Sequence, residues 1–196
     1  DELFRVSKNQ IVWGGNYFPL PPSRCIVCWD KIQHFENFSQ VELAWTSFDS
    51  PAQLYRFDNK TGGKIHPTQK PVKLYEWLLK HYAKPTDKIL DTHFGSCSIG
   101  IACHNFGCSL DACELDGQYF DKALERVKLH VRQLDLFRQV TIMKHLVLLV
   151  CLVLLCLTYD FIQNTGDIPI VLVIGDILSL MIVSIIIKDK RHGKNK

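Results

Sequence analysis

The sequence predicts an α/β protein with a parallel sheet covered by helices, followed by a hairpin of two membrane-spanning helices. Three observations lead to this prediction. A strand-rich first half is followed, from Pro71 onward, by strands that alternate with segments of helical apolar spacing. A strand at 88–91 runs into a glycine-containing turn that opens a helix. Between Leu146 and Ile187, the only charged residues are three aspartates, so this part of the chain has the composition of a membrane protein.

The first half of the chain is rich in predicted strands. Residues 1–8 have the apolar spacing of a helix. Apolar runs bounded by glycine, proline and polar residues then predict strands at 11–13, 24–30 and 41–46.

From Pro71 onward the apolar period becomes helical. The spacing predicts a helix at 72–82, the strand 88–91 and a helix at 98–105. A strand at 109–114 and a long amphipathic helix from about 118 to 136 follow. Strands that alternate with helices are typical of a parallel sheet with both faces covered.

The last part of the chain is apolar enough to cross a bilayer twice. Residues 143–162 and 168–187 would each span about 30 Å as helices, which matches the hydrocarbon thickness. Asp176 would cost about 2.5–3.5 kcal/mol at the bilayer centre, and the many Leu, Ile and Val residues of its segment outweigh that cost. A pair of buried core helices is the alternative. The sequence from Met143 resembles the start of a small membrane protein, as if a neighbouring reading frame had been fused.

Composition excludes several classes of protein. The chain has 196 residues, of which 47% are hydrophobic and 22% charged, so neither a disordered chain nor a large multidomain machine fits. The formal net charge of +3 permits an anionic partner without requiring one. The eight cysteines are scattered, which favours reduced thiols. Cys25 and Cys28 have the spacing of half a zinc site, but a buried strand explains them better, and we predict no metal site.

The strand at 88–91 and the strand at 109–114 together predict an adenosine pocket. Gly95 lies in the turn where backbone amides can approach a ligand. Glu114 follows 23 residues after Asp91, where a carboxylate can accept hydrogen bonds from both hydroxyls of a ribose. The alternative is that Gly95 only relieves a tight turn and Glu114 only caps the next helix.

A further motif, His-Pro-Thr-Gln-Lys-Pro at 66–71, directly precedes the helix that leads into this strand. With this motif, the turn of Asp91, Gly95 and Ser96, and the Trp-Gly-Gly run at 13–15, the chain resembles the circularly permuted DNA amino-methyltransferases of bacteria and phages. The resemblance covers residues 1 to about 135. It implies a Rossmann-like, incomplete methyltransferase sheet that binds S-adenosylmethionine and acts on double-stranded DNA. The implied cofactor-binding residues are His66, Thr68, Lys70, Asp91, Phe94, Gly95, Ser96 and Glu114.

Two features depart from the family pattern. The family holds the target amine with Asp, Asn or Ser followed by Pro-Pro and an aromatic residue, whereas the only Pro-Pro pair here, Pro21-Pro22, is framed by Leu20 and Ser23. No catalytic residue can therefore be assigned, and in the permuted order the motif would precede residue 1. Cys97 stands where relatives have glycine, and its side chain is expected to crowd the cofactor or to strain the turn.

Cations interleaved with aromatic residues suggest a DNA-binding surface between the Pro-Pro pair and the motif at 66–71. The candidates are Arg24, Lys31, Arg56 and Lys60. A solvated basic face over a packed core would have the same composition, so both interpretations stay open.

These observations predict two domains. Residues 1–140 are predicted to be a partial DNA methyltransferase domain, specific for the adenine exocyclic amine and inactive as this fragment. Residues 143–196 are predicted to form a transmembrane hairpin with a basic tail, contacting lipid through 143–187 and leaving the methyltransferase domain in the cytoplasm. The alternative is a small membrane-anchored protein whose cofactor-binding domain is vestigial. The choice between adenine and cytosine, the recognition sequence and the oligomeric state are left open.

Overall fold

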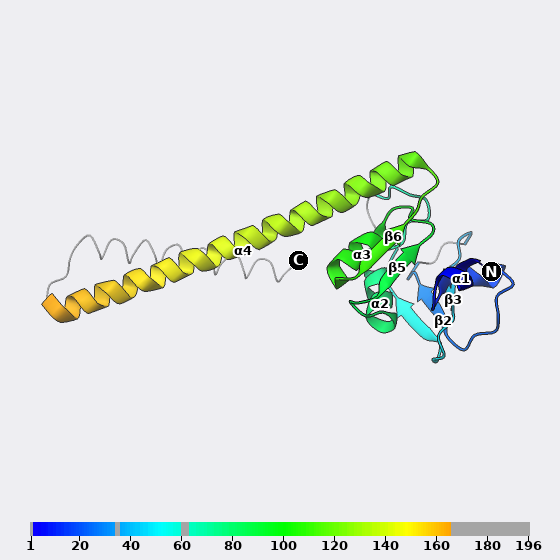
Figure 1. Ribbon diagram of the computed structural model, residues 1–196, viewed down its shortest axis with the longest axis horizontal. Coiled ribbons are helices and arrows are strands. Elements are labelled where there is room, and N and C mark those ends of the chain that lie inside the picture. The colour runs from blue at the N-terminus through cyan, green and yellow to red at the C-terminus, as the bar shows by residue number, and fades with distance from the viewer. Residues whose placement is uncertain (1, 34–35, 60–62, 166–196) are drawn as a thin grey trace. The chain divides into compact units, whose positions relative to one another are not determined.

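The computed structural model describes residues 2–33, 36–59 and 63–165, in which helices and strands are mixed (Figure 1). The elements are α1 (Glu2–Val6), β1 (Ile11–Trp13), the 3-10 helix η1 (Gly15–Tyr17), β2 (Ile26–Asp30), β3 (Val41–Thr46), β4 (Gln53–Arg56), α2 (Val72–Tyr82), β5 (Lys88–Asp91), α3 (Ser98–Phe106), β6 (Ser109–Ala112) and α4 (Gly117–Thr165). Every strand predicted from the sequence is present, and β4 is an additional strand. The prediction missed β4 because its short edge segment has no apolar run, with half-buried and exposed residues alternating along it.

The strands form two sheets rather than the one parallel sheet that the sequence predicts. The first has the order β1-β3-β2-β4, in which β3 runs antiparallel to both β1 and β2, and β2 runs parallel to β4. The second contains β5 and β6, which are parallel and are linked through α3. The parallel pairing predicted from the alternation after Pro71 is confirmed for β5 and β6. In the first half of the chain no helix separates the strands, and β3 runs antiparallel to both of its neighbours.

Helix α2 packs against both sheets. Leu78 lies in a buried cluster with Val27 and Ala44 of the four-stranded sheet. Leu79, the next residue, lies in a second cluster with Ile99 and Ala102 of α3, against which Ile89 and Leu110 of the two-stranded sheet pack. The helical apolar spacing that predicts α2 therefore produces a helix whose buried side reaches two sheets at once.

The chain divides into two compact units between His130 and Val131, inside α4, whereas the sequence suggests a boundary near 140–143. Helix α4 runs without interruption from Gly117 to Thr165, so the expected break after residue 136 is absent. The cause is that residues 137–142 contain neither glycine nor proline to end a helix.

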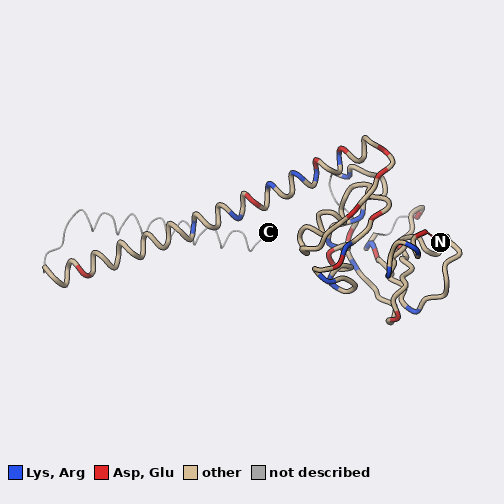
Figure 2. Tube along the Cα trace, in the orientation of Figure 1, with Lys and Arg blue, Asp and Glu red and all other residues tan. Residues whose placement is uncertain are grey.

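Charged residues mark the first part of α4 and nearly disappear beyond Lys144, where only Asp160 is charged up to Thr165 (Figure 2). This is the one helix of the described residues that is long and apolar enough to cross a membrane. The predicted second span, 168–187, lies outside the described residues.

Candidate cofactor-binding site

The carboxyl ends of β5 and β6 lie at one edge of their sheet because the two strands are parallel, with Asp91 opposite Ala112. The turn after β5 is fastened to the turn after β6 by the Phe94 amide, which donates to the Cys113 carbonyl at 2.9 Å. Gly95 follows with a φ of 52°, in the left-handed region that favours glycine. The turn then leads into α3, and the amides of Phe94, Gly95 and Cys97 all donate hydrogen bonds within the protein.

Glu114 lies just beyond the end of β6 and is hydrogen-bonded to this turn. Its Oε2 accepts a hydrogen bond from the Gly95 amide at 2.7 Å, and its Oε1 accepts one from the Asp116 amide at 3.1 Å. The Asp116 and Gly95 amides lower the pKa of Glu114 below its ordinary value, so the carboxylate stays ionised. The residue that caps α4 is Asp116, whose Oδ1 accepts from the amides of Gln118 and Tyr119, and not Glu114.

The motif at 66–71 reaches this turn through His66. A Cβ placed on Gly95 would lie 3.6 Å from His66 Nδ1, so the imidazole packs directly over the glycine. The Thr68 hydroxyl lies 3.0 Å from His66 Nδ1, and the Tyr119 ring packs edge-on against the imidazole with ring centroids 4.4 Å apart. The structure thus brings His66, Gly95 and Glu114 together from three separate segments of the chain.

Gln69, a residue of this motif that the sequence analysis did not single out, holds the motif's shape. Its side chain is 5% exposed, and its Oε1 accepts a hydrogen bond from the Ile65 amide at 3.1 Å. Its own amide donates to the His66 carbonyl. Gln69 therefore positions His66 from inside the loop.

Lys70 is held in a cluster of charges. Glu42 on β3 lies 3.0 Å from both Lys70 Nζ and Lys31 Nζ, and Lys70 Nζ also lies 5.2 Å from the centroid of Trp13. Burial alone would raise the pKa of Glu42, but the charge of Lys70 and the hydrogen bonds from both lysines lower it below its ordinary value. Two lysines therefore share the single carboxylate of Glu42.

Asp91 ends β5 and is half-buried. Burial raises its pKa above the ordinary value, while the His93 amide, which donates to Oδ1 at 3.0 Å, acts in the opposite direction. The positive charge of Lys70 also acts to lower the pKa of Asp91. His93 is exposed and serves as a loop residue of this turn.

The side chain of Cys97 points into the protein and not into the turn's open side. Cys97 is 1% exposed, with a φ of 57° in the left-handed region. Its sulfur lies so close to Gly100 that a Cβ at position 100 would overlap it. Burial raises the pKa of Cys97 to about 12. The left-handed φ of Cys97 agrees with the expected strain in the turn, and Gly100 makes room for the sulfur.

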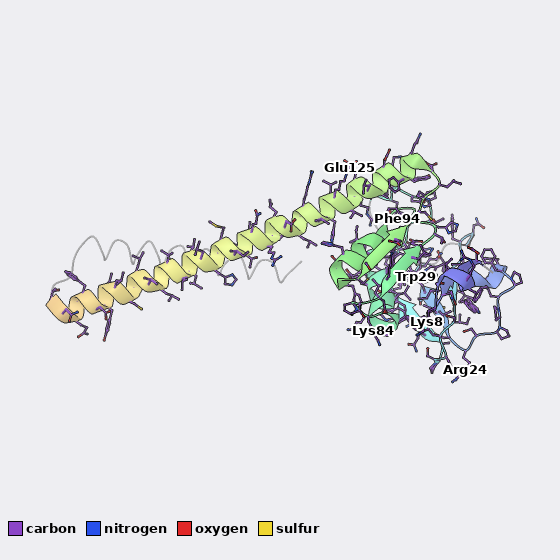
Figure 3. The ribbon with its side chains drawn as sticks, in the orientation of Figure 1. Lys8, Arg24, Trp29, Lys84, Phe94 and Glu125 are labelled. Atoms are coloured by element: carbon purple, nitrogen blue, oxygen red, sulfur yellow. The ribbon has the colours of Figure 1, made fainter. Side chains whose placement is uncertain are left out.

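Arg126 of α4 is hydrogen-bonded to the turn and to the start of α3. Its guanidinium donates to the Ser96 carbonyl at 2.6 Å and to the Ser98 hydroxyl at 3.0 Å. Phe94, labelled in Figure 3, is half-buried, and its ring lies 6.3 Å from that of Phe120 on the same helix. The sequence offered no indication of Arg126, because an arginine on an amphipathic helix is usually a solvated residue.

The predicted DNA-binding cations are mostly engaged with carboxylates. Arg24 (labelled in Figure 3) contacts Asp49 at 2.7 Å, and Arg56 contacts Asp30 at 3.2 Å, both with exposed side chains. The side chain of Lys31 is only 10% exposed, and its ammonium forms an ion pair with Glu42. Lys60 lies outside the described residues.

The two other sequence features have structural explanations. The Pro21 carbonyl accepts a hydrogen bond from Trp45 Nε1 at 2.6 Å, so the Pro-Pro pair contacts the four-stranded sheet at Trp45 of β3. Cys25 is fully buried next to Tyr82, whereas Cys28 lies an odd number of residues further along the strand and faces the other side. Within residues 2–33, 36–59 and 63–165, no group of three or more His, Cys, Asp or Glu side chains could hold a metal ion.

Residues 10–125 match the DNA methylase family of the N6/N4 type. The chain belongs to the DNA methylase family. Among DNA methylases, it is 32% identical to the type II methyltransferase M.HinfI of Haemophilus influenzae over 97 residues, which are 50% of this chain and 27% of that one. It is 25% identical to the type II methyltransferase M1.MboII of Moraxella bovis over 124 residues, 63% of this chain and 42% of that one. The chain thus spans less than half the length of these curated relatives.

Two solved structures resemble this DNA methylase chain. The complex of M1.HpyAVI with SAM is 24% identical, with a TM-score of 0.43, over 52% of this chain and 60% of that one. TTHA0409 from Thermus thermophilus, complexed with S-adenosyl-L-methionine, is 20% identical, with a TM-score of 0.41, over 54% of this chain and 53% of that one.

Proposed function

We propose that residues 1–130 are the S-adenosylmethionine-binding part of a site-specific DNA methyltransferase of the restriction-modification type. The observation that supports this most is the meeting of His66, Gly95 and Glu114 at the carboxyl edge of β5 and β6. This is the edge at which open α/β sheets bind nucleotide-like ligands.

The residues present fit an adenosine-containing cofactor. Each oxygen of the Glu114 carboxylate accepts one amide and keeps a second lone pair that a ribose hydroxyl could use. The low pKa keeps Glu114 an acceptor at neutral pH. The side chain of Cys97 is buried beside Gly100 and is not exposed on the surface of the turn.

The proposed reaction moves the sulfonium methyl of the cofactor to the exocyclic amine of adenine in double-stranded DNA. That amine is a poor nucleophile because its lone pair is delocalised into the ring, so the base must leave the stack and be held in line with the methyl group. Residues 1–196 contain no motif suited to hold the amine, because their single Pro-Pro pair is not flanked by the required polar and aromatic residues. In the structure the Pro21 carbonyl instead accepts a hydrogen bond from Trp45 Nε1. We therefore expect this chain alone to transfer no methyl group.

Calorimetry of S-adenosylmethionine with the whole chain in mild detergent tests the cofactor site. Glu114→Ala should weaken binding about 10- to 100-fold, because charge-assisted hydrogen bonds are worth about 1.5–3 kcal/mol. Asp121→Ala, an exposed carboxylate on α4, is the matched control and should leave binding unchanged. Equal affinity of all three proteins would show that the cofactor does not bind at Glu114.

Incubation of the same protein with labelled cofactor and mixed-sequence duplex DNA tests the missing motif. The expected result is no label in the DNA above a sample without protein. Label in N6-methyladenine would show that a group within this chain holds the base, and label in N4-methylcytosine would also overturn the adenine assignment.

We also propose that the apolar end of α4 anchors the protein in a membrane, with the methyltransferase part on the cytoplasmic side. Large apolar side chains on this segment are exposed, among them Leu149 at 58% and Leu157 at 56%. Burying such surface in lipid is favourable, and a helix satisfies its own backbone hydrogen bonds there. This observation also favours the second candidate function, a membrane protein whose cofactor-binding domain is not catalytic.

The distribution of cations predicts the orientation. Lys144 precedes the first apolar stretch, Lys188 and further cations follow the second, and residues 163–167 contain none, so both ends should face the cytoplasm. Single cysteines at Asn164 and Asn195, in a background without the native cysteines, can be labelled in intact cells with a membrane-impermeant reagent. Labelling at 164 alone is expected. Labelling at 195 alone would invert the topology, and recovery of the chain in the soluble fraction would exclude the anchor.

A further inference from the structure

Two cysteines lie close together at the carboxyl end of α3. Cys103 is in the last turn of the helix, and Cys108 follows two residues after the helix ends. Gly107, between the helix and Cys108, has a φ of 85°, in the left-handed region that turns a chain back across the end of a helix. The amides of Gly107 and Cys108 both donate to the Cys103 carbonyl, at 2.8 and 3.2 Å. This glycine cap therefore folds Cys108 back onto Cys103.

The backbone places the two Cα atoms within reach of a disulfide bond. The Cys108 amide lies 3.2 Å from the Cys103 carbonyl oxygen. With standard bond lengths on either side of this hydrogen bond, the Cα atoms are no more than about 7 Å apart. Disulfides usually join Cα atoms that are about 4.4–6.8 Å apart. Closing a disulfide here therefore requires little movement of the backbone.

The side chains of the two cysteines point into the same part of the core. Cys103 is 2% exposed and belongs to the buried cluster that contains Leu79 and Ile99. Cys108 is half-buried and packs against that cluster. Burial raises the pKa of Cys103, and the neighbouring Cys108 thiol raises it further, as a hydrogen-bond partner and as a charge. The two sulfur atoms are thus neighbours, and Cys108 is the more accessible of the two.

We propose that Cys103 and Cys108 form a redox site that reacts with a low-molecular-weight disulfide, such as oxidised glutathione, and closes to an intramolecular disulfide. The half-buried Cys108 reacts first, because its thiolate attacks one sulfur of the reagent, forms a mixed disulfide and releases one thiol. The Cys103 thiol then loses its proton and attacks the Cys108 sulfur, which releases the second thiol. Two protein thiols are oxidised, and one reagent disulfide is reduced to two thiols.

Closure of this disulfide fastens the end of α3 to the start of β6. Cys108 directly precedes β6, which begins at Ser109. The raised pKa of Cys103 keeps its thiolate scarce near neutral pH, so closure is slow and becomes faster as the pH rises. The site therefore responds to sustained oxidation. It lies at the end of α3 opposite to the candidate cofactor turn, so it does not depend on the proposed function.

Peptide mapping of the oxidised protein tests the closure. The whole chain in mild detergent would be incubated with oxidised glutathione at about pH 8, where thiolates form. Its remaining thiols would then be alkylated in denaturant, and the chain would be cleaved with chymotrypsin. Phe106 lies between the two cysteines, so cleavage after it leaves two peptides that only the new disulfide joins. This joined pair is the expected product, and it should separate on reduction.

Glutathione buffers of fixed ratio measure how far the fold favours closure. The equilibrium constant for closure should be about tenfold or more larger in the folded chain than in the chain unfolded in urea. The reason is that the glycine cap holds Cys103 and Cys108 together in the folded chain, whereas the unfolded segment samples many conformations.

Matched serine variants identify the pair. Cys108→Ser should slow the oxidation of Cys103 about tenfold or more, because the buried thiol then lacks both its partner and its route to the reagent. Cys103→Ser should accumulate glutathione on Cys108, since no second thiol displaces it. Cys113→Ser replaces an exposed cysteine as the control and should form the joined peptides as fast as the unmodified chain. If Cys103→Ser does not fold, the Cys108 variant decides the test.

Three results would overturn the proposal. The first is glutathione that stays on Cys108 of the unmodified chain while Cys103 remains a thiol. The second is a disulfide that joins either residue to another cysteine. The third is an equilibrium constant for closure that is no larger in the folded chain than in urea. The assay contains no S-adenosylmethionine, so failure of this redox site and failure of the proposed function can be distinguished.

Discussion

Cys97 and Gly100 form a coupled pair whose energetics can be worked out from the structure. Cys97→Gly relieves a left-handed non-glycine residue, worth about 1–2 kcal/mol. The variant also loses a fully buried side chain, which lowers the free energy of unfolding by about 0.8 kcal/mol for each buried carbon-sized group. The greater backbone flexibility of glycine lowers it by a further amount of about 0.5–1 kcal/mol. With two heavy atoms removed, the losses come to about 2–2.5 kcal/mol and slightly exceed the gain, so we expect the free energy of unfolding to fall by up to about 1.5 kcal/mol.

Gly100→Ala should behave very differently alone and in combination. Alone, alanine gains about 1 kcal/mol of helix propensity in α3, but its Cβ overlaps the Cys97 sulfur, and overpacking costs about 1–3 kcal/mol. In the Cys97→Gly background the overlap is gone and the propensity gain remains. We expect the double variant to exceed the sum of the single variants by about 1–3 kcal/mol.

Urea unfolding of the four proteins, followed by tryptophan fluorescence, measures this coupling. All four tryptophans lie within residues 1–130, so the signal reports on the unit that contains the pair. Additivity to within about 0.5 kcal/mol would refute the reasoning, because it would mean that the sulfur does not occupy the space above Gly100.

Three further predictions concern the supports of the site. Glu42→Gln should lower the free energy of unfolding by about 2–3 kcal/mol, less than for a fully buried ion pair because Glu42 is partly exposed. Since the folded-state pKa of Glu42 is lowered, its contribution is present above the unfolded carboxyl pKa of about 4.3 and is lost as the pH falls below it. Urea midpoints between pH 3 and 7 should therefore depend less on pH in the variant, and parallel curves would contradict this. Arg126→Met removes two hydrogen bonds and should lower the free energy of unfolding by about 1.5–3 kcal/mol. It should also weaken S-adenosylmethionine binding in calorimetry. Unchanged affinity would show that the turn does not need this support. A thiol reagent at pH 8 should modify exposed Cys113 and leave Cys97 unmodified until the protein unfolds. Peptide mass mapping would identify the modified cysteines. Modification of Cys97 before unfolding would mean that its sulfur is accessible.

The elements and the family could be predicted from the sequence because both depend on local patterns. Apolar spacing predicted α2 and α3, and the strands β1, β3 and β5 lie where the predicted runs lie. The motif at 66–71, with Asp91 and Glu114, was sufficient to indicate a DNA methyltransferase, and the family match agrees. Such motifs are recognisable because the chemistry requires particular residue types at particular distances along the chain.

Tertiary structure alone decided how these segments meet. The division into two sheets depends on which edges pair across long separations, and apolar periodicity does not encode the partner of a strand. Arg126 and Glu42 became part of the site only through folding, which brings α4 to Ser96 and β3 to Lys70. The same holds for Cys97, whose side-chain direction depends on the space above Gly100, three residues away on the first turn of α3. Packing and long-range electrostatics determine these contacts, and both require coordinates in three dimensions.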